Sequence, residues 1–182
     1  MIEIDKFKIA PVFICVILAS LAVAMQQKSN SPQKPSEKDN RQFSIVQGEM
    51  DGHPLFAMIA SDLEKYPAKS KFPWFLSLST PLIDPTPDGL PQGKDFDGLN
   101  AWEDEIEARI GKLGNYFYVG HVTWKGSREA LFYVEKAEPV VTELKKLRNS
   151  HSIRPFDFRC EKDEGWKKIS PYIHPIKQPS SN

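Results

Sequence analysis

The sequence predicts an α+β fold in which one sheet carries two helices on the same face. Three observations predict it. Residues 116–136 hold two runs of aromatic and β-branched residues around a short turn, which is the pattern of a β-hairpin. Apolar residues recur at helical spacing in residues 95–113 and 138–148, on either side of that hairpin. Residues 72–79 and 153–160, which precede and follow these segments, have the composition of strands.

The predicted order is strand, helix, strand, strand, helix, strand, which is the ferredoxin-like βαββαβ arrangement. Right-handed crossovers place both helices on one sheet face, and the first and third of these strands are expected in the middle. An N-terminal β-hairpin is predicted ahead of them, because Asp51-Gly52 is a turn signal between the apolar runs 43–47 and 54–60. We expect this hairpin to extend a sheet edge or to cover part of the open face.

Residues 1–25 are predicted to be a signal peptide or a membrane anchor. Lys6 and Lys8 precede an apolar run over residues 9–25, which is slightly shorter than the roughly 20 residues of a membrane span. Ala22-Val23-Ala24 fits the pattern that a signal peptidase cleaves. Cleavage and anchoring by residues 9–25 are both open at this point. Either one predicts an exported protein, periplasmic or extracellular, that meets the membrane only through this segment.

The rest of the chain divides into a linker, a domain and a tail. Residues 26–42 contain no aliphatic residue and are rich in Gln, Lys, Ser and Pro, so we expect a flexible linker. A single α+β domain is predicted over residues 43–172. Residues 173–182 are rich in Pro, Lys and Ser and are predicted to be a disordered tail.

The helices and the loop between them follow from simple patterns. Residues 80–93 contain four prolines, which predicts a stiff loop outside the sheet interior. The first helix presents one apolar stripe, formed by Leu99, Trp102, Ile106, Ile110 and Leu113. The second helix has basic residues at its C-terminal end, as the helix dipole favours. Pro155 favours an edge position for the last strand, and residues 163–172 are predicted to add a helical turn anchored by Trp166.

Strict alternation gives the central hairpin two different faces once Thr123 is paired with Arg128. The face expected to be buried holds Phe117, Val119, His121, Ala130, Phe132 and Val134. The face expected to be half exposed holds Tyr116, Tyr118, Val122, Glu129, Leu131, Tyr133 and Glu135. His121 is interpreted as a hydrogen-bonded core histidine.

Four residues of this hairpin are candidates for a binding surface: Tyr118, Arg128, Glu129 and Tyr133. Aromatic rings and an arginine supply rigid contact area and directed hydrogen bonds. The competing interpretation is that the two tyrosines form an ordinary cross-strand pair beneath the N-terminal hairpin.

Charge and composition argue against several classes of site. Lys plus Arg equals Asp plus Glu at 24 each, so an electrostatic nucleic-acid partner is not predicted. The acidic residues 103–107 are interpreted as a solvated helix start, because successive helical positions point in different directions. Cys15 and Cys160 are the two cysteines, and the four histidines lack metal-binding spacing. No metal and no cofactor is predicted.

Several motifs together resemble the domain of unknown function 695 family. They are the strand of residues 72–79, Trp102-Glu-Asp-x-Ile106, the hairpin motif Tyr118-Val-Gly-His-Val-Thr-x-x-Gly-x-Arg-Glu-x-x-Phe-Tyr133, and Asp163-x-x-Trp166. The resemblance covers roughly residues 43–172 and implies no activity. In some proteins this domain is joined to one similar to the regulator of ribonuclease E activity B, which implies a ferredoxin-like fold and a protein-binding role.

These observations favour a non-catalytic, regulatory or protein-binding module over an enzyme. The expected partner is another protein, which contacts the sheet face or an edge strand. The alternative is a hydrolase of unrecognised type with a site near Arg128 and Glu129, together with His121 or a carboxylate. It needs these groups within hydrogen-bond reach of one another.

Overall fold

The computed structural model describes residues 41–151 and 153–170, so the predicted leader, most of the linker and the tail lie outside the described residues. The domain is α+β, as the sequence predicts. Its strands are β1 (Phe43–Met50), β2 (His53–Ala60), β3 (Trp74–Pro81), β4 (Tyr116–Trp124), β5 (Ser127–Val134) and β6 (Asp157–Lys162). Its α-helices are α2 (Asp95–Gly111) and α3 (Ala137–Ser150), and a 3₁₀ turn, η2, spans Lys69–Lys71.

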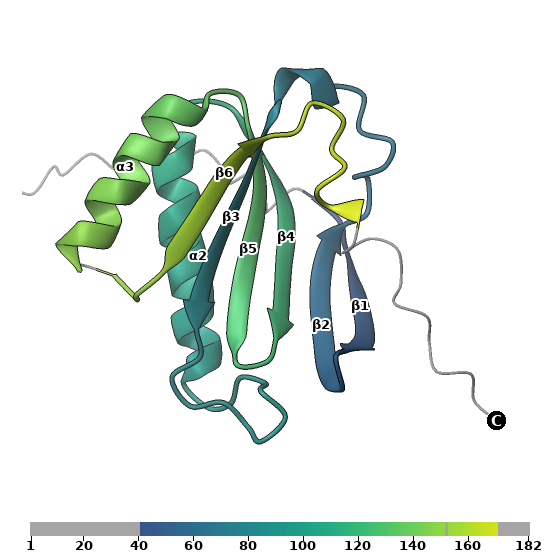
Figure 1. Ribbon diagram of the computed structural model, residues 1–182, viewed down its shortest axis with the longest axis vertical. Coiled ribbons are helices and arrows are strands. Elements are labelled where there is room, and N and C mark those ends of the chain that lie inside the picture. Colours follow the sequence, from purple (N-terminus) through teal and green to yellow (C-terminus); the bar gives the residue numbers. More distant parts are fainter. Residues whose placement is uncertain (1–40, 152, 171–182) are drawn as a thin grey trace, which may run out of the picture. The chain divides into compact units, whose positions relative to one another are not determined.

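The strands form one six-stranded antiparallel sheet in the order β1-β2-β4-β5-β3-β6. The hairpin β4–β5 and the strand β3 lie inside the sheet, whereas β1 and β6 form its two edges (Figure 1). β1 pairs with β2 along its whole length, and β2 continues the sheet by pairing with β4. The sheet edges are therefore a strand from the start of the described chain and a strand near its end.

Both α-helices pack on the same side of the sheet (Figure 1). The stripe Trp102, Ile106 and Ile110 of α2 meets the apolar residues of β3 and β5 in one buried cluster. Val140, Leu144 and Leu147 of α3 complete that cluster. The sequence stripe therefore packs as predicted, with the difference that α2 ends at Gly111 and Leu113 is only partly buried.

The opposite face of the sheet is buried as well, which corrects the expectation of a half-exposed face. Trp166 stacks on the ring of Tyr133 with centroids 4.1 Å apart, and its indole Nε1 donates to the Phe72 carbonyl at 3.0 Å. The irregular segments 61–72 and 163–170 cover this side. A second core results, whose buried residues include Leu63, Phe72, Phe75, Phe117, Val119, Leu131, Tyr133, Trp166 and Ile169.

A β-bulge in β4 explains why the predicted faces of the hairpin were partly wrong. Thr123 pairs with Arg128 as predicted, but the register shifts between Tyr118 and Gly120, so that an extra residue enters β4. In β4, the side chains before the bulge therefore lie on the faces opposite to those predicted. Tyr118 therefore packs on the helix side, while Phe117 and Val119 pack on the other side. Gly120 has φ 138, and a Cβ there would collide with the carbonyl oxygen of Met58 on β2.

The remaining differences concern element ends. The last strand begins at Asp157, because Arg154 and Pro155 are drawn into contacts with the end of β3. Among the described residues, no helix combines the length and the apolar character that crossing a membrane requires. The predicted apolar run, residues 9–25, lies outside the described part of the chain.

Candidate functional site

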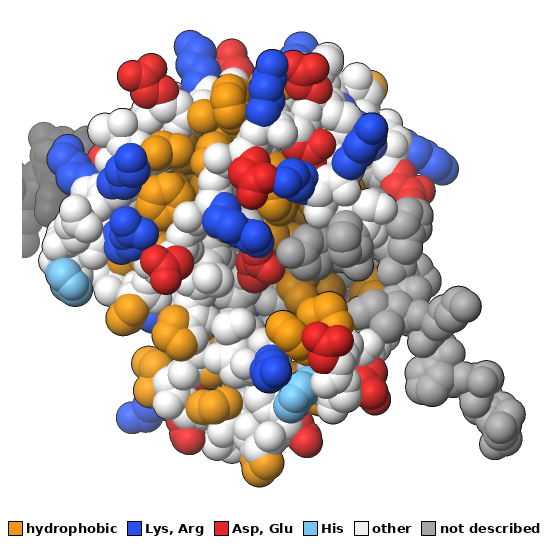
Figure 2. All heavy atoms as spheres, viewed as in Figure 1, with side chains coloured by type: hydrophobic (Ala, Val, Ile, Leu, Met, Phe, Trp, Pro, Cys, Tyr) orange, Lys and Arg blue, Asp and Glu red, His pale blue; other side chains and the backbone are white. Residues whose placement is uncertain are grey.

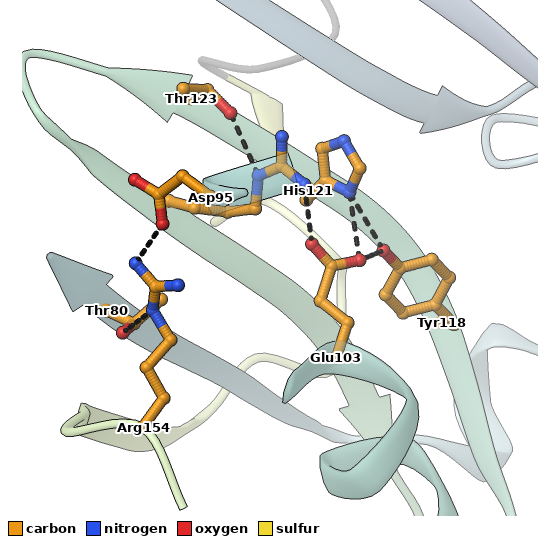
Figure 3. Close-up of polar contacts among 8 residues, drawn as sticks. Thr80, Asp95, Glu103, Tyr118, His121, Thr123 and Arg154 are labelled. Atoms are coloured by element: carbon orange, nitrogen blue, oxygen red, sulfur yellow. Dashed lines mark hydrogen bonds and ion pairs between the residues drawn. The ribbon is translucent and has the colours of Figure 1, made fainter. Parts of the chain in front are cut away.

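A buried carboxylate, Glu103 of α2, gathers polar side chains of β4 and β5 around itself (Figure 3). Its side chain is 1% exposed. Glu103 Oε2 accepts a hydrogen bond from the Tyr118 hydroxyl at 2.8 Å and lies 3.0 Å from His121 Nδ1. Glu103 Oε1 accepts from Arg128 Nη1 at 3.2 Å, and Arg128 Nε donates to Thr123 Oγ1 at 3.0 Å. We call these five residues the Glu103 network.

Helix and strand geometry bring these groups together in register. Four helical residues advance by about 6 Å, and two strand residues advance by about 7 Å. Two contacts of the same kind therefore form side by side. Tyr118 reaches Glu103, and Tyr116 donates to Glu107 Oε1 at 2.8 Å one turn further along α2. Burial and then the negative charge of Glu103 raise the pKa of Tyr118, so its hydroxyl stays a donor.

The network holds His121 in one orientation. A carboxylate only accepts hydrogen bonds, so the contact with Glu103 places the ring hydrogen on Nδ1. Nε2 is then the acceptor nitrogen of the neutral ring. The His121 side chain is 15% exposed, more than its partners Glu103 and Arg128. Met58 and His121 are paired across β2 and β4, so their side chains lie on the same sheet face. A histidine oriented by a carboxylate is the arrangement that general bases use.

A second buried ion pair fixes the proline-rich loop to the start of α2 (Figure 3). Arg154 Nη2 lies 2.6 Å from Asp95 Oδ1, with side chains 8% and 1% exposed. Arg154 also donates to the Pro81 carbonyl at 2.7 Å, while the Ile83 amide donates to Asp95 Oδ2 at 2.9 Å. Burial acts to raise the pKa of Asp95, but the hydrogen bonds from Arg154 and from backbone amides outweigh it and lower the pKa. This pair positions the loop rather than exposing a charge.

The described residues offer no cluster of three His, Cys, Asp or Glu side chains that could hold a metal ion. Cys160 on β6 is half-buried, and burial together with the charge of Glu161 raises the pKa of its thiol to about 11. A thiol with this pKa is protonated near neutral pH and is a poor nucleophile. The oriented His121 therefore lies without a thiolate partner in the part of the chain that the structure describes.

The described domain matches a known protein family. The model of a family of unknown function, DUF695, matches residues 42–171. The chain belongs to the DUF695 family. No curated protein and no solved structure matched the chain. The match spans β1 to the residues just after Trp166, so the whole sheet, both helices and the Glu103 network belong to the DUF695 domain.

The DUF695 domain divides the four predicted binding residues between two sheet faces. Tyr118 and Arg128 meet at Glu103 on the helix side. Glu129 lies on the other side, where Ser77 donates to it and Arg159 donates at 3.2 Å. Tyr133, also on that side, donates to Asp163 Oδ2 at 2.6 Å. Both tyrosines are 0% exposed, so these four residues do not form one binding surface.

Asp163 and Trp166 hold the end of the DUF695 domain against the sheet. The Asp163 carboxylate accepts hydrogen bonds from the backbone amides of Lys167 and Lys168 at 3.0 and 2.7 Å, in addition to the Tyr133 hydroxyl. Burial acts to raise the pKa of Asp163, but these hydrogen bonds outweigh it and lower the pKa. Asp163 and Trp166 therefore fix the C-terminal segment, and Trp166 is the anchor that the sequence predicts.

Glu103, the centre of the network, is not among the site residues that the sequence predicts. The acidic residues 103–107 were expected to be solvated, yet Glu103 and Glu107 are 1% and 3% exposed. A signal for this was present in the periodicity. Glu103 follows Leu99 by four residues and precedes Ile106 by three, so it lies beside the apolar stripe of α2. An acidic residue at such a position needs a buried partner, and β4 and β5 provide three.

Proposed function

We propose that this DUF695 domain is a non-enzymatic protein-binding module that uses the outer edge of β1. One observation carries the proposal: among the described residues, β1 is an edge strand with little of the usual protection, because Glu49 is its single charged residue. Its sequence contains no Pro, Lys or Arg, and Ile45 is 75% exposed. Edge strands that avoid pairing normally carry Pro or charged residues, especially Lys. The other edge, β6, alternates Asp157, Arg159 and Glu161 with other residues and is charged along its length.

The hydrogen-bond pattern identifies which groups of β1 are available. The Ser61 amide donates to the Gln42 carbonyl at 2.9 Å, in register with the β1–β2 ladder. Every second residue from Gln42 onward therefore directs its backbone groups toward β2. The intervening residues direct theirs away from the sheet; they are Phe43, Ile45, Gln47 and Glu49. An extended segment of another protein adds to such an edge by main-chain hydrogen bonds.

The closed sheet faces support an edge rather than a face as the binding element. The expected open face is covered by Trp166 and its neighbours, and on the helix side α2 and α3 cover β3, β4 and β5. On the face shown in Figure 2, Lys and Arg side chains are interspersed with Asp and Glu. A surface of mixed sign suits a protein partner better than the phosphate backbone of a nucleic acid.

Two finer inferences complete the proposal. We infer that the sheet is a ferredoxin-like βαββαβ unit extended by the β1–β2 hairpin, and the order β4-β5-β3-β6 supports this. We also infer that the domain is exported and is either released or held at the membrane by residues 9–25. The apolar run and Ala22-Val23-Ala24 support export. Fractionation and N-terminal sequencing of the expressed chain test it, and an unprocessed chain in the cytoplasmic fraction would contradict it.

A peptide selection tests the binding function. Random ten-residue peptides are selected for binding to the full chain. The affinity of each binder is then measured for two variants in which Gln47 is replaced. Gln47→Pro removes an outward N–H without touching the β1–β2 ladder, whereas Gln47→Ala keeps that N–H. We expect binders that lose affinity for Gln47→Pro and keep it for Gln47→Ala. Binders that ignore both substitutions, or no binders to a chain that sediments as a monomer, would contradict an edge-binding function.

A hydrolase is the second candidate, and the orientation of His121 by Glu103 is the observation that favours it. Glu129 is not available to this site, because it lies on the opposite face of the sheet. The test is a broad screen with ester, amide and phosphoester substrates. Turnover by the wild-type chain that disappears in His121→Ala, and persists in His53→Ala, would support hydrolysis. Absence of turnover in the wild type would leave the binding module as the function.

A further inference from the structure

We infer that the strand added to the β1 edge is β1 of a second copy of this chain, paired antiparallel about a two-fold axis at Ile45. This inference rests on the proposed function, because it names the partner of the same edge. Such a pair joins the two sheets into one continuous sheet. The interface is isologous, so it closes after two copies.

The register follows from the outward residues of β1. The outward residues of β1 carry odd numbers, and each forms hydrogen bonds only with an outward residue of the second copy. The numbers of two facing residues therefore add up to an even sum. An axis at Ile45 places Ile45 opposite Ile45 of the second copy and Gln47 opposite Phe43. An axis at Val46 or at Gln47 would place the exposed Ile45 opposite Gln47 or Glu49 instead. Only the axis at Ile45 pairs the most exposed apolar side chain of β1 with its like.

Neighbouring side chains extend this apolar contact. Ile45 and Met58 are paired across β1 and β2, so they lie on one sheet face. Phe56 lies on the same face two residues before Met58, and both are partly exposed. The two-fold axis is perpendicular to the sheet, so the second copy presents the same sheet face on the same side. Ile45, Phe56 and Met58 of both copies therefore form one strip beside the helices.

Charge favours a second copy over a β1–β6 contact. The formal net charge of the chain is zero, so two copies do not repel each other at long range. Glu49 is the sole charged residue of β1, and the Ile45 axis keeps the two Glu49 side chains about eight residues apart along the joint. β6 instead presents Asp157, Arg159, Glu161 and Lys162, which suit polar solvent rather than Ile45.

Cysteine crosslinking tests the register directly. In the full chain carrying Cys15→Ser and Cys160→Ser, Ile45→Cys places two thiols across the axis. Facing residues of this pair have Cα atoms about 5.5 Å apart, within the range that a disulfide spans. Gln47→Cys is the matched control, because its two copies lie more than about 13 Å apart. We expect an oxidised dimer for Ile45→Cys and none for Gln47→Cys. Equal crosslinking of both, or of neither, would overturn the register.

The mass of the full chain in solution tests the dimer without any cysteine. Sedimentation is expected to give twice the mass of one chain for the wild type and for Gln47→Ala. Gln47→Pro and Ile45→Lys are expected to give the mass of one chain. A wild-type monomer at all concentrations would overturn the inference. If selected peptides still bound that monomer through Gln47, the edge-binding function would stand without the dimer. If they did not, the function would fail as well.

Discussion

The hydroxyl of Tyr118 donates a hydrogen bond to Glu103 Oε2 at 2.8 Å, and both side chains are almost fully buried. This contact joins α2 to β4 by a polar bond inside an otherwise apolar core. Arg128 balances the charge of Glu103 from the next strand. Replacing a buried ion pair with apolar residues is often neutral for stability, whereas removal of one partner is costly. Replacing a single member of the network is therefore expected to lower the stability of the folded chain.

Glu103→Gln is expected to lower the free energy of unfolding by about 3 kcal/mol, because Arg128 stays buried without its counter-charge. Urea denaturation of the full chain measures this. Glu105→Gln is the control on the same helix, since Glu105 pairs with Arg109 at the surface, with side chains 41% and 36% exposed. Its expected cost is below about 1 kcal/mol. Equal costs for the two substitutions would contradict a structural role for the Glu103 network.

Tyr118→Phe is expected to cost about 1.5–3 kcal/mol, the value of a hydrogen bond to a charged group. The reason is the loss of the hydroxyl donor to Glu103, with the ring packing kept. Combined with Glu103→Gln in a double-mutant cycle, the two costs are expected not to add. Additive costs would show that the 2.8 Å contact contributes nothing of its own.

Gly120→Ala is expected to loosen β2 from β4. A Cβ at Gly120 collides with the Met58 carbonyl, and φ 138 disfavours any other residue. Hydrogen exchange of the β1–β2 amides measures the loosening. Gly126→Ala is the control, because Gly126 also has a positive φ of 77 but has open space around it. Faster exchange confined to the first variant is the expected result, and unchanged exchange would argue against the close β2–β4 approach.

Stability is expected to fall in acid partly through Asp163. The pKa of Asp163 is below its usual 3.8 in the folded protein. The stabilisation is therefore complete above about pH 4 and is lost as the pH falls through the folded pKa. Asp163→Asn is expected to be less stable than the wild type at pH 7, with a difference that shrinks on acidification. A difference that stays constant down to about pH 2 would contradict this assignment.

Alkylation of Cys160 is expected to be slow at neutral pH and to accelerate up to about pH 11, following the raised pKa of its thiol. The rate is measured with iodoacetamide on a Cys15→Ser chain, so that Cys160 is the thiol that reacts. A rate that levels off near pH 8.5, as for an ordinary cysteine, would show that the side chain is more exposed than the structure indicates.

The elements of this fold were predictable where hydrophobic periodicity is strong. The stripe of α2 and the alternation of β4 and β5 gave the correct elements, and the pairing of Thr123 with Arg128 was correct. The bulge was missed because strict alternation was assumed through Gly120, although a glycine inside a strand is itself a sign of a bulge. That single extra residue moved Tyr118 and Phe117 to opposite cores from those expected.

The closed second face was not predictable in the same way. It is made by segments 61–72 and 163–170, which are mostly turns and carry no periodic signal. Trp166 was correctly interpreted as an anchor, but its target, the ring of Tyr133, depends on tertiary packing. Glu103 was missed for a related reason. Its buried partners lie 15 to 25 residues away in sequence, and local charge alone suggests a solvated helix start.

Strand addition at β1 is tested most directly by amide hydrogen exchange along β1 in the full chain, measured at low and at high concentration. We expect Val46 and Gly48 to be protected at both concentrations, because their amides bond to β2. We expect Ile45 and Gln47 to exchange freely in dilute solution and to become protected when a strand is added, as strand addition requires. Protection of Ile45 and Gln47 in the dilute monomer, or their continued free exchange at high concentration and with every selected peptide, would contradict it.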